Sequence, residues 1–401
     1  TNAADWTYVS PAAIGTSDCL VTNFRLVFSA ALPAPATFDS EDVDAEFLAT
    51  DPAKAGNANI LIQNDSVSML GSSSAGLSVP YTYNYSIPTT TWTPTAMAPD
   101  CWNISVTPHP VCSIDDLAQV DDNPAWAGDS FILMNDLDMT GVTWDPLFNG
   151  MGYEFSGDFN GGNRKISNLS DFVVYANDTG LFGLSNGGHI HNLTLDNITM
   201  SNTSSSVGAL VAYAKDTHIE NIRLENSNIF GADAVGGVVG KYENTTGSGE
   251  MNEIFVSNTN VTLTSGSKFV GGLAGYITGP GSPLIIKNVY VDGGQVRGYD
   301  LVGGMIGGTD GAVLLEGSYT KNSVVSEGSG VGFGGLVGRT GPSVQIANSY
   351  SSSNINLDNG GQSTGGLVGN VGGGDSAINS SYFNGTISGV ALGNPSYQTG
   401  G

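Results

Sequence analysis

A short glycine-rich hydrophobic motif recurs along this chain from Gly180 onward at a nearly constant interval. Seven copies begin at Gly180, Gly208, Gly236, Gly271, Gly303, Gly334 and Gly365, and Gly334-Gly-Leu-Val-Gly338 is typical of them. A period of about 30 residues indicates one supersecondary unit per repeat, and such units stack because none of them buries its apolar face alone. The repeat therefore constrains the architecture strongly and the activity much less.

A second motif of the form Ile-x-Asn keeps step with the first. It occurs at Ile166-Ser-Asn168, Ile190-His-Asn192, Ile219-Glu-Asn221, Ile286-Lys-Asn288 and Ile346-Ala-Asn348, with degenerate copies at Met251, Leu315 and Ile378. Side chains alternate along a strand, so Ile190, Leu193 and Leu195 face the same side only if the alternation changes at Asn192. Asparagine tolerates a left-handed backbone, so we expect a corner there, with corner asparagines of successive repeats hydrogen-bonded to one another.

These repeats predict an all-β fold with two or three short strands per repeat. Glycine makes up 57 of the 401 residues, and the apolar runs are short and rich in β-branched residues, which disfavours helices. A β-propeller blade needs about 40–45 residues, and the frame of leucine-rich repeats is absent. The remaining architecture is a parallel β-helix of about seven to eight coils.

The two motifs, together with the segment that leads into them, resemble the GLUG-motif repeats of bacterial and archaeal surface proteins. The leading segment contains Leu133-Met-Asn-Asp-Leu-Asp138, Trp144-Asp-Pro and Phe155-Ser-Gly-Asp-Phe-Asn-Gly-Gly162, and the resemblance covers about residues 112–390. It implies a right-handed β-solenoid in an extracellular and often adhesive protein. The family is defined by a structural repeat, so the resemblance transfers no catalytic residue to this chain.

Residues 1–111 lack the repeat and contain prolines at short intervals. Strand-like runs at 19–28, 81–85 and 101–106 are separated by turn signals, which predicts an immunoglobulin-like β-sandwich. Pro108-His-Pro110 is interpreted as a stiff linker. We therefore divide the chain into a sandwich domain at 1–111, a capping segment at 112–165, and a solenoid with a C-terminal tail at 166–401.

The capping segment contains the one short helix that the sequence predicts. Ser113-Ile-Asp-Asp116 has a capping-box-like start in which Asp replaces Glu. The end of a solenoid otherwise exposes unpaired strand edges and apolar core, so we expect this helix to cover it.

The chain is strongly acidic, with a formal net charge of −25 at pH 7. A field of this sign repels nucleic acid and anionic lipid, so neither is an expected partner, and solubility in a salty or acidic exterior is the preferred interpretation. The alternative is Ca²⁺ binding, the only cofactor that the sequence suggests. Two acidic runs supply the oxygen ligands that Ca²⁺ prefers, although neither has an EF-hand loop: Asp39, Glu41, Asp42 and Asp44 form one, and Asp136 and Asp138 the other.

Cysteine and histidine offer few sites for disulfide or metal chemistry. Cys19 and Cys101 lie in strand-like runs and are the preferred disulfide pair; Cys101–Cys112 is the competing pair, and one thiol is left over in either case. His189 and His191 share a strand face, but no carboxylate follows them at ligand spacing. A plain surface role is therefore favoured over a zinc site.

Export from the cell is expected. The chain begins at Thr1 and has no apolar run near 18 residues, which we interpret as the mature form of a secreted protein without direct membrane insertion. Twelve Asn-x-Ser/Thr sequons occur, and those at Asn64, Asn84 and Asn103 are candidate glycosylation sites. No sorting motif or lipid-anchor signal is recognisable, so we expect display through a partner or through copies of the chain itself.

An enzymatic function is less favoured, although parallel β-helices include polysaccharide lyases and hydrolases. A lyase acting on acidic sugars requires a basic groove, whereas the few basic residues do not cluster across successive repeats. A hydrolase requires two carboxylates about 5–9 Å apart, and Asp196 and Glu225 occupy equivalent positions in consecutive repeats. That position continues as Ser257, Asp292 and Lys321, which is typical of a solvated face.

One position of the repeat is aromatic in five successive copies. The copies are Phe255, Tyr290, Tyr319, Tyr350 and Tyr382, preceded by Thr194 and Arg223. Facing outward, these rings would suit sugar rings or another subunit; facing inward, they would be core. Arg223 and Thr194 favour the outward orientation, but stacked aromatic rings are a common packing solution in repeats, and we favour the core.

These observations favour a non-enzymatic, extracellular structural or adhesive surface protein that associates with copies of itself or with another surface protein in a fibre or layer. A monomeric carbohydrate-binding adhesin module is the alternative. The run Asp5-Trp-Thr-Tyr-Val9 alternates in a way that suits addition to a neighbour's sheet edge, so Trp6, Tyr8 and Val9 are the predicted assembly residues. Pairing of this run within its own domain is the competing interpretation.

Overall fold

The computed structural model describes residues 36–38, 67–69, 102–149, 152–172, 178–201, 206–264, 269–357, 360–389 and 399–400. The chain divides into two compact units, Thr1–Asp100 and Cys101–Gly401. In the first unit the described residues form one antiparallel pair, β1 (Ala36–Phe38) with β2 (Val67–Met69). The sandwich topology predicted for this region lies outside the described residues.

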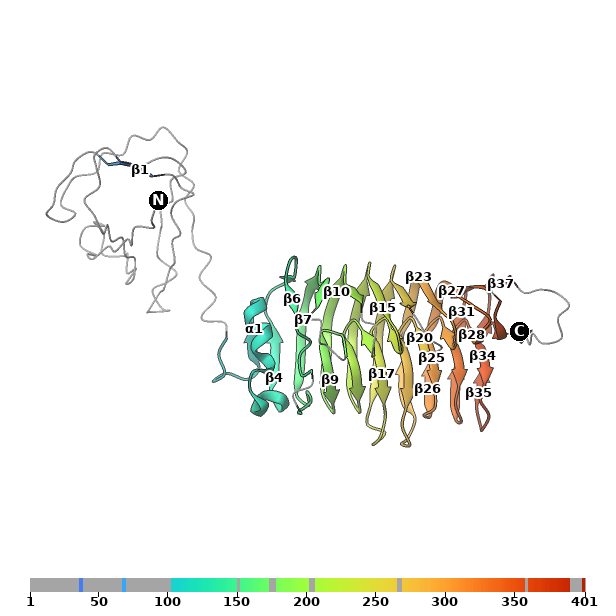
Figure 1. The fold of residues 1–401 in the computed structure, drawn as a ribbon. Coiled ribbons are helices and arrows are strands. Elements are labelled where there is room, and N and C mark those ends of the chain that lie inside the picture. Colours follow the sequence, from blue (N-terminus) through green and yellow to red (C-terminus); the bar gives the residue numbers. More distant parts are fainter. Residues whose placement is uncertain are drawn as a thin grey trace. The chain divides into compact units, whose positions relative to one another are not determined.

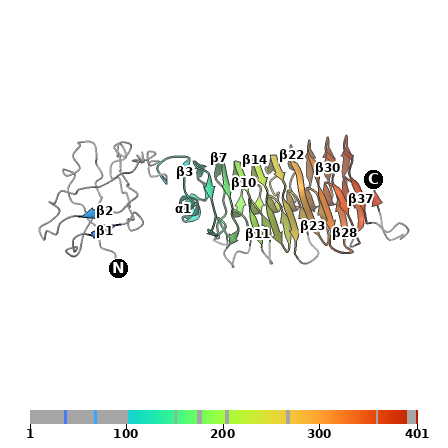
Figure 2. The ribbon, with the colours of Figure 1, turned by 90° about the horizontal axis from the view of Figure 1, so that it is seen from above.

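The second unit is a parallel β-solenoid of about eight turns (Figure 1). Its strands pair in parallel from one coil to the next, and in Figure 2 the strands of one face follow one another in the order β7, β10, β14, β22 and β30. The all-β, parallel β-helix prediction is confirmed.

Three sheets run along the solenoid. The first contains β9 (Phe182–Asn186), β13 (Val211–Lys215), β17 (Val239–Glu243), β21 (Ala274–Thr278), β25 (Ile306–Thr309), β29 (Val337–Thr340) and β34 (Val368–Val371). The second contains β12 (Val207–Gly208), β16 (Ala234–Gly236), β20 (Phe269–Gly271), β24 (Val302–Gly303), β28 (Val331–Gly334), β33 (Gln362–Gly365) and β38 (Thr399–Gly400).

The third sheet is the largest and bends at corners within each coil. It contains β3 (His109–Val111), β4 (Ser130–Leu133), β5 (Leu137–Asp138), β7 (Asp158–Ser167), β10 (His189–Asp196), β11 (Thr199–Ser201), β14 (His218–Glu225), β15 (Asn228–Gly231), β18 (Glu250–Ser257), β19 (Asn260–Leu263), β22 (Leu284–Lys287), β23 (Tyr290–Gly298), β26 (Val313–Glu316), β27 (Tyr319–Ser326), β30 (Val344–Ala347), β31 (Tyr350–Ser351), β32 (Asn354–Asn356), β35 (Ala377–Asn379), β36 (Tyr382–Phe383) and β37 (Thr386–Ser388). A separate pair, β6 (Thr143–Trp144) with β8 (Asp171–Phe172), lies among the first coils.

The glycine-rich motif marks places where neighbouring coils approach closely. Gly236 pairs with Gly271, and Gly271 with Gly303, so successive copies stack in register as predicted. A Cβ atom on Gly272 would lie 2.4 Å from the carbonyl oxygen of Gly304. No side chain fits there, because the backbone of the next coil already fills the space.

The asparagine motif forms the corners of the third sheet. Asn192 and Asn221 have φ angles of 57° and 48°, and the apolar residues near Asn192, Ile190 and Leu193, are buried. Asn221 Nδ2 donates a 2.8 Å hydrogen bond to Asn192 Oδ1. The predicted corner, with its change of side-chain alternation and its bonds between coils, is confirmed.

One member of the asparagine motif was placed in the wrong column. Ile166 lies opposite Leu195, not Ile190, because β7 carries extra residues opposite the step from His191 to Leu193. Asn168 therefore belongs to a second column of left-handed corners, and Asn197 Nδ2 donates to its Oδ1 at 2.7 Å. The coils of β10 and β14 therefore each have two asparagine corners, at Asn192 and Asn197 and at Asn221 and Asn226, where the sequence motif predicted one.

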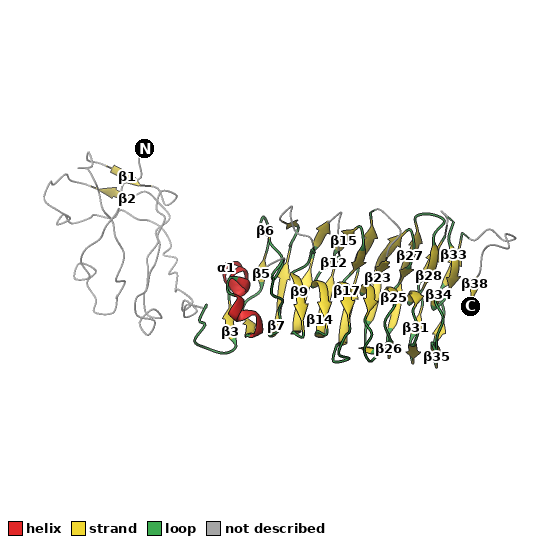
Figure 3. Cartoon of the chain, turned by 60° about the horizontal axis from the view of Figure 1, so that its bottom comes forward, coloured by secondary structure: helices red, strands yellow, loops and turns green. Residues whose placement is uncertain are grey.

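The predicted helix is present as α1 (Ile114–Ala118) and lies at the N-terminal end of the solenoid (Figure 3). The backbone N–H of Asp116 donates to Ser113 Oγ, and that of Ser113 donates to Asp116 Oδ2, which completes the capping box. Leu117 is fully buried in the core. Two 3₁₀ helices that were not predicted follow, η4 (Gln119–Asp121) and η5 (Pro124–Gly128).

The predicted linker and the domain boundary at residue 111 are wrong. His109–Val111 forms β3, which pairs in parallel with β4, and the His109 side chain is buried with its Nε2 3.1 Å from Asp129 Oδ2. Among the described strands, β3 pairs with β4 alone, and proline is compatible with such an edge position. The solenoid unit therefore begins at Cys101, before the two prolines.

Candidate functional site: an outward aromatic column

The five predicted aromatic residues form one continuous column on the third sheet. Phe255, Tyr290, Tyr319, Tyr350 and Tyr382 lie opposite one another in successive coils. Their strand neighbours Val289 and Val291 are buried, whereas Tyr290 is only half-buried. The column therefore faces outward, and the core orientation favoured from the sequence is wrong.

The reason lies in small polar residues that occupy the core of the later coils. Ser349 and Ser351, on either side of Tyr350, are buried. Thr320 Oγ1 donates to the carbonyl oxygen of Gly335 at 2.7 Å, and Ser353 Oγ donates to Thr320 Oγ1 at 3.0 Å. Hydrogen bonds thus allow serine and threonine inside, and the larger tyrosine rings lie outside.

The rings of the column stack on one another along the solenoid axis. The centroid distances are 4.8 Å for Tyr290–Tyr319 and 5.1 Å for both Tyr319–Tyr350 and Tyr350–Tyr382, and the last two pairs are within 11° of parallel. At the other end the Arg223 guanidinium lies 5.4 Å from the Phe255 ring centroid, within reach of a cation–π contact. Most ring faces are therefore used within the column, and Tyr382, at 57% exposed, is the most open ring.

The hydroxyl groups of the column form an outward row of neutral hydrogen-bonding groups. Burial raises the pKa of Tyr319, and the nearby Asp292 carboxylate adds to that rise. Burial also raises the pKa of Tyr350. Because the phenols of Tyr319 and Tyr350 stay protonated near neutral pH, they are suited to apolar contact and to hydrogen bonding.

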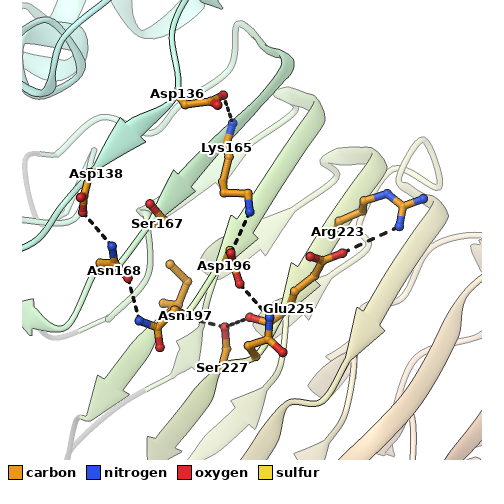
Figure 4. Close-up of polar contacts among 12 residues, drawn as sticks. Asp136, Asp138, Lys165, Ser167, Asn168, Asp196, Asn197, Arg223, Glu225 and Ser227 are labelled. Carbon is orange, nitrogen blue, oxygen red and sulfur yellow. Dashed lines mark hydrogen bonds and ion pairs between the residues drawn. The ribbon is translucent and has the colours of Figure 1, made fainter.

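The proposed carboxylate pair, Asp196 and Glu225, is adjacent but engaged in polar contacts (Figure 4). Lys165 Nζ lies 2.8 Å from Asp196 Oδ2, and Asn226 Nδ2 donates to Asp196 Oδ1 at 2.9 Å. The hydrogen bond from Lys165 holds the pKa of Asp196 below its ordinary value. A carboxyl group in this state is a poor general acid, so Asp196 is unsuited to that role.

The candidate Ca²⁺ ligands Asp136 and Asp138 are directed to different partners (Figure 4). Asp138 Oδ1 accepts hydrogen bonds from Thr140 and from Asn168, and these bonds lower its pKa. Asp136 Oδ1 accepts the backbone N–H of Lys165 at 2.9 Å. The other acidic run, with Asp39, Glu41, Asp42 and Asp44, lies outside the described residues.

Cys112 is disulfide-bonded, and its partner lies outside the described residues. Each cysteine forms one such bond, so the preferred Cys19–Cys101 pair is wrong and a pairing through Cys112 replaces it. Trp6, Tyr8 and Val9, with Asn64 and Asn84, also lie outside the described residues. The sequon residue Asn103 is exposed, and its Oδ1 accepts the backbone N–H of Ser105.

A group that the sequence reasoning missed lies beside the two histidines. Asp158, the first residue of β7, is directly opposite His189 of β10, so a carboxylate from the preceding coil meets both imidazoles. The sequence-based prediction considered only carboxylates that follow the histidines in the chain. The repeat itself holds the signal, because a residue about one period upstream lies on the same face.

Within the part of the chain that the structure describes, no helix combines the length and the apolar character that a membrane crossing requires.

Comparisons with known proteins place only part of this chain. No family model matches it. A segment of 144 residues is 33% identical to Halomucin of Haloquadratum walsbyi; it makes up 33% of this chain and spans only 2% of that relative. Among solved structures, a candidate immunoglobulin A1 protease from Bacteroides ovatus is similar over 72% of this chain and 81% of its own, with a TM-score of 0.46 and 20% identity. An IgA1 protease is similar over 72% of this chain and 21% of its own, with a TM-score of 0.35 and 16% identity.

Proposed function

We propose that this chain is a non-enzymatic, extracellular surface protein whose solenoid associates with copies of itself or with another surface protein. The assignment of its repeats to the GLUG type is part of the proposal. The in-register glycine columns support that assignment.

The observation that carries the proposal is the exposure of three large apolar side chains on the coil of β34–β37. Val371 is 61% exposed, Ile378 48% and Tyr382 57%, and they lie on three different strands of that coil. Each of these strands pairs with a strand of the preceding coil. Among the described strands, β34, β35 and β36 have no partner on their other edge, and exposed apolar side chains on such edge strands favour contact with another β element.

Two further features support the setting and the lack of catalysis. A disulfide at Cys112 fits an oxidising, extracellular compartment, and the net charge of −25 fits solubility there. The engagement of Asp196 by Lys165 makes this member of the candidate carboxylate pair a poor general acid.

Electron microscopy and light scattering of the purified chain test the association. We expect ordered oligomers or filaments in the wild type, and monomers when Val371→Asp and Ile378→Asp are combined. Ile285→Asp is the matched control, because Ile285 is 37% exposed on β22 in the middle of the solenoid. A wild type that stays monomeric at every concentration, or variants that assemble normally, would contradict the proposal.

Deletion of residues 1–9 distinguishes the alternative contact through Trp6, Tyr8 and Val9. If the deletion abolishes assembly in a folded protein while Val371→Asp and Ile378→Asp do not, the N-terminal run is the contact instead.

Glycan binding is a second candidate function, and the exposed Tyr382 ring at the end of the column favours it. An exposed aromatic face stacks on the apolar face of a sugar ring. A glycan array followed by titration of the Tyr382→Ala variant tests this. Binding lost in Tyr382→Ala but kept in the Val371→Asp variant would assign the ring to glycan recognition rather than to association.

A further inference from the structure

Asp158, His189 and His191 form a compact cluster on the outer face of the first full coils. Figure 2 shows their strands, β7 and β10, side by side. Asp158 Oδ1 lies 2.9 Å from His189 Nδ1 and 3.2 Å from His191 Nε2. One nitrogen or oxygen from each residue lies within 4.8 Å of the other two.

The fold produces this cluster without any special loop. His189 and His191 are two residues apart, so they project from the same face of β10. Asp158 lies opposite His189 in the parallel register of the neighbouring strand, at the spacing of about 4.8 Å that separates paired strands. All three side chains are on strands, and they lie in the part of the β7–β10 pairing that precedes its register shift.

We propose that this cluster binds a divalent transition metal such as Zn²⁺ or Cu²⁺. Two imidazole nitrogens and one carboxylate oxygen are a donor set that these ions prefer. The side chains of His189 and Asp158 are each 39% exposed, so an ion has access and water can complete its coordination. This inference does not depend on the proposed surface function.

His191 gives independent support. Its Nε2 is buried without a hydrogen bond, although it lies close to the Asp158 carboxylate. A buried nitrogen left in this state is unfavourable. A metal ion between His191 and Asp158 satisfies it.

Two local changes must accompany binding. The imidazoles of His189 and His191 are stacked, with centroids 4.1 Å apart and planes within 5° of parallel. Coordinate bonds lie in the ring plane, so the rings must turn out of this stack to reach one ion.

The second change concerns the proton of His191. Its Nδ1 lies 2.8 Å from Asn192 Nδ2, and Asn192 is oriented by hydrogen bonds to Asn160 and from Asn221. The amide therefore donates to Nδ1, which puts the proton of a neutral ring on Nε2. Metal binding at Nε2 requires the proton on Nδ1 instead, and an acceptor at position 192 would favour that tautomer.

Isothermal titration of the untagged full chain with Zn²⁺, and visible absorption with Co²⁺, test the site. We expect one ion per chain. His189→Ala, His191→Ala and Asp158→Asn should each weaken binding at least about tenfold, and His218→Ala should leave it unchanged. His218 is the matched control because it lies opposite His189 in the next coil.

A second pair of variants tests the role of the tautomer. Asn192→Asp supplies an acceptor beside His191 and should tighten binding, whereas Asn258→Asp, at another left-handed asparagine corner two coils further on, should not. Thermal unfolding and circular dichroism verify that each variant is folded. Absence of saturable Zn²⁺ binding, or equal affinity in the wild type and in folded His189→Ala and His191→Ala, would overturn the proposal and assign any bound ion to the acidic surface.

Discussion

The side chain of Asn221 donates a 2.8 Å hydrogen bond to the side-chain oxygen of Asn192, the residue directly equivalent to it in the preceding coil. Both residues have left-handed backbones. One side chain therefore does two tasks: it allows the corner of its own coil, and it fixes the position of that corner relative to the next.

Replacing Asn221 separates these two tasks. Asn221→Ala should lower the free energy of unfolding by about 1–2 kcal/mol, because alanine disfavours the left-handed backbone and the hydrogen bond is lost. Asn221→Gly restores the backbone freedom and should cost less. Urea denaturation measures both, and equal losses in the two variants would show that the backbone conformation contributes little.

Glycine-to-valine changes in the stacked motif should destabilise the solenoid. A Cβ at Gly335 would lie 2.2 Å from the carbonyl oxygen of Gly366, and Gly272 is similarly crowded by Gly304. We expect a loss of about 1–3 kcal/mol or failure to fold for Gly272→Val and Gly335→Val. Gly128→Ala is the control, since its nearest neighbour would be Ser156 Oγ at 3.7 Å. An unchanged melting temperature in either valine variant would refute the close packing of the coils.

Asp121 should make stability depend on pH. Burial, with a smaller contribution from Asp122, raises the pKa of Asp121 to about 6 from 3.8. The folded state therefore holds this proton more tightly than the unfolded state. The resulting stabilisation is complete below about pH 4 and is lost as the pH rises through about 6.

Asp121→Asn tests this dependence. Its Oδ1 can still accept the backbone N–H of Phe148, as Asp121 Oδ2 does. The variant should match the wild type near pH 4 and exceed it at pH 7.5 by up to about 3 kcal/mol. Asp375→Asn, an exposed change of the same charge, is the control. Parallel profiles of Asp121→Asn and wild type across this range would argue against a raised pKa.

The tyrosine column should contribute to stability through ring stacking. Tyr350 stacks on both Tyr319 and Tyr382, so Tyr350→Ala should cost about 1–3 kcal/mol. Tyr350→Phe keeps the ring and should be nearly neutral. Denaturation curves compare the two, and a phenylalanine variant as unstable as the alanine variant would point to the hydroxyl group instead of the stack.

The repeat motifs predicted the architecture because local residue preference and stacking agree in them. Gly236 and Asn192 are each required by the backbone of their own coil, and the same residue types recur at equivalent places, so a single sequence shows the column. The assignment of Ile166 to the column of Ile190 was wrong for a physical reason. Extra residues in β7 shift its register, so this copy of Ile-x-Asn lies at the second corner of its coil.

The candidate site was harder to predict than the fold. It depends on whether each side chain faces the core or the solvent, and on contacts between residues of neighbouring coils. Ring stacking favoured a core position for Tyr350, whereas hydrogen bonds to Gly335 and between Thr320 and Ser353 stabilise small polar residues in the core and leave the rings outside. The meeting of Asp158 with His189 depends on a register that the irregular β7 obscures. Local sequence patterns predict the corners within a coil, but they do not predict which residues of neighbouring coils come into contact.

Because the coils stack in register, the length of the solenoid is proportional to its number of coils. Each coil advances the axis by about 4.8 Å, the spacing of paired strands. Duplication of one unit, such as residues 271–302, would repeat contacts that already exist and would lengthen the solenoid by a fixed step. The outward-facing positions of the coils are less restricted than these stacked positions. Within one column, for example, Arg223 is followed by Phe255 and then by Tyr290. Reach and surface chemistry can therefore evolve independently.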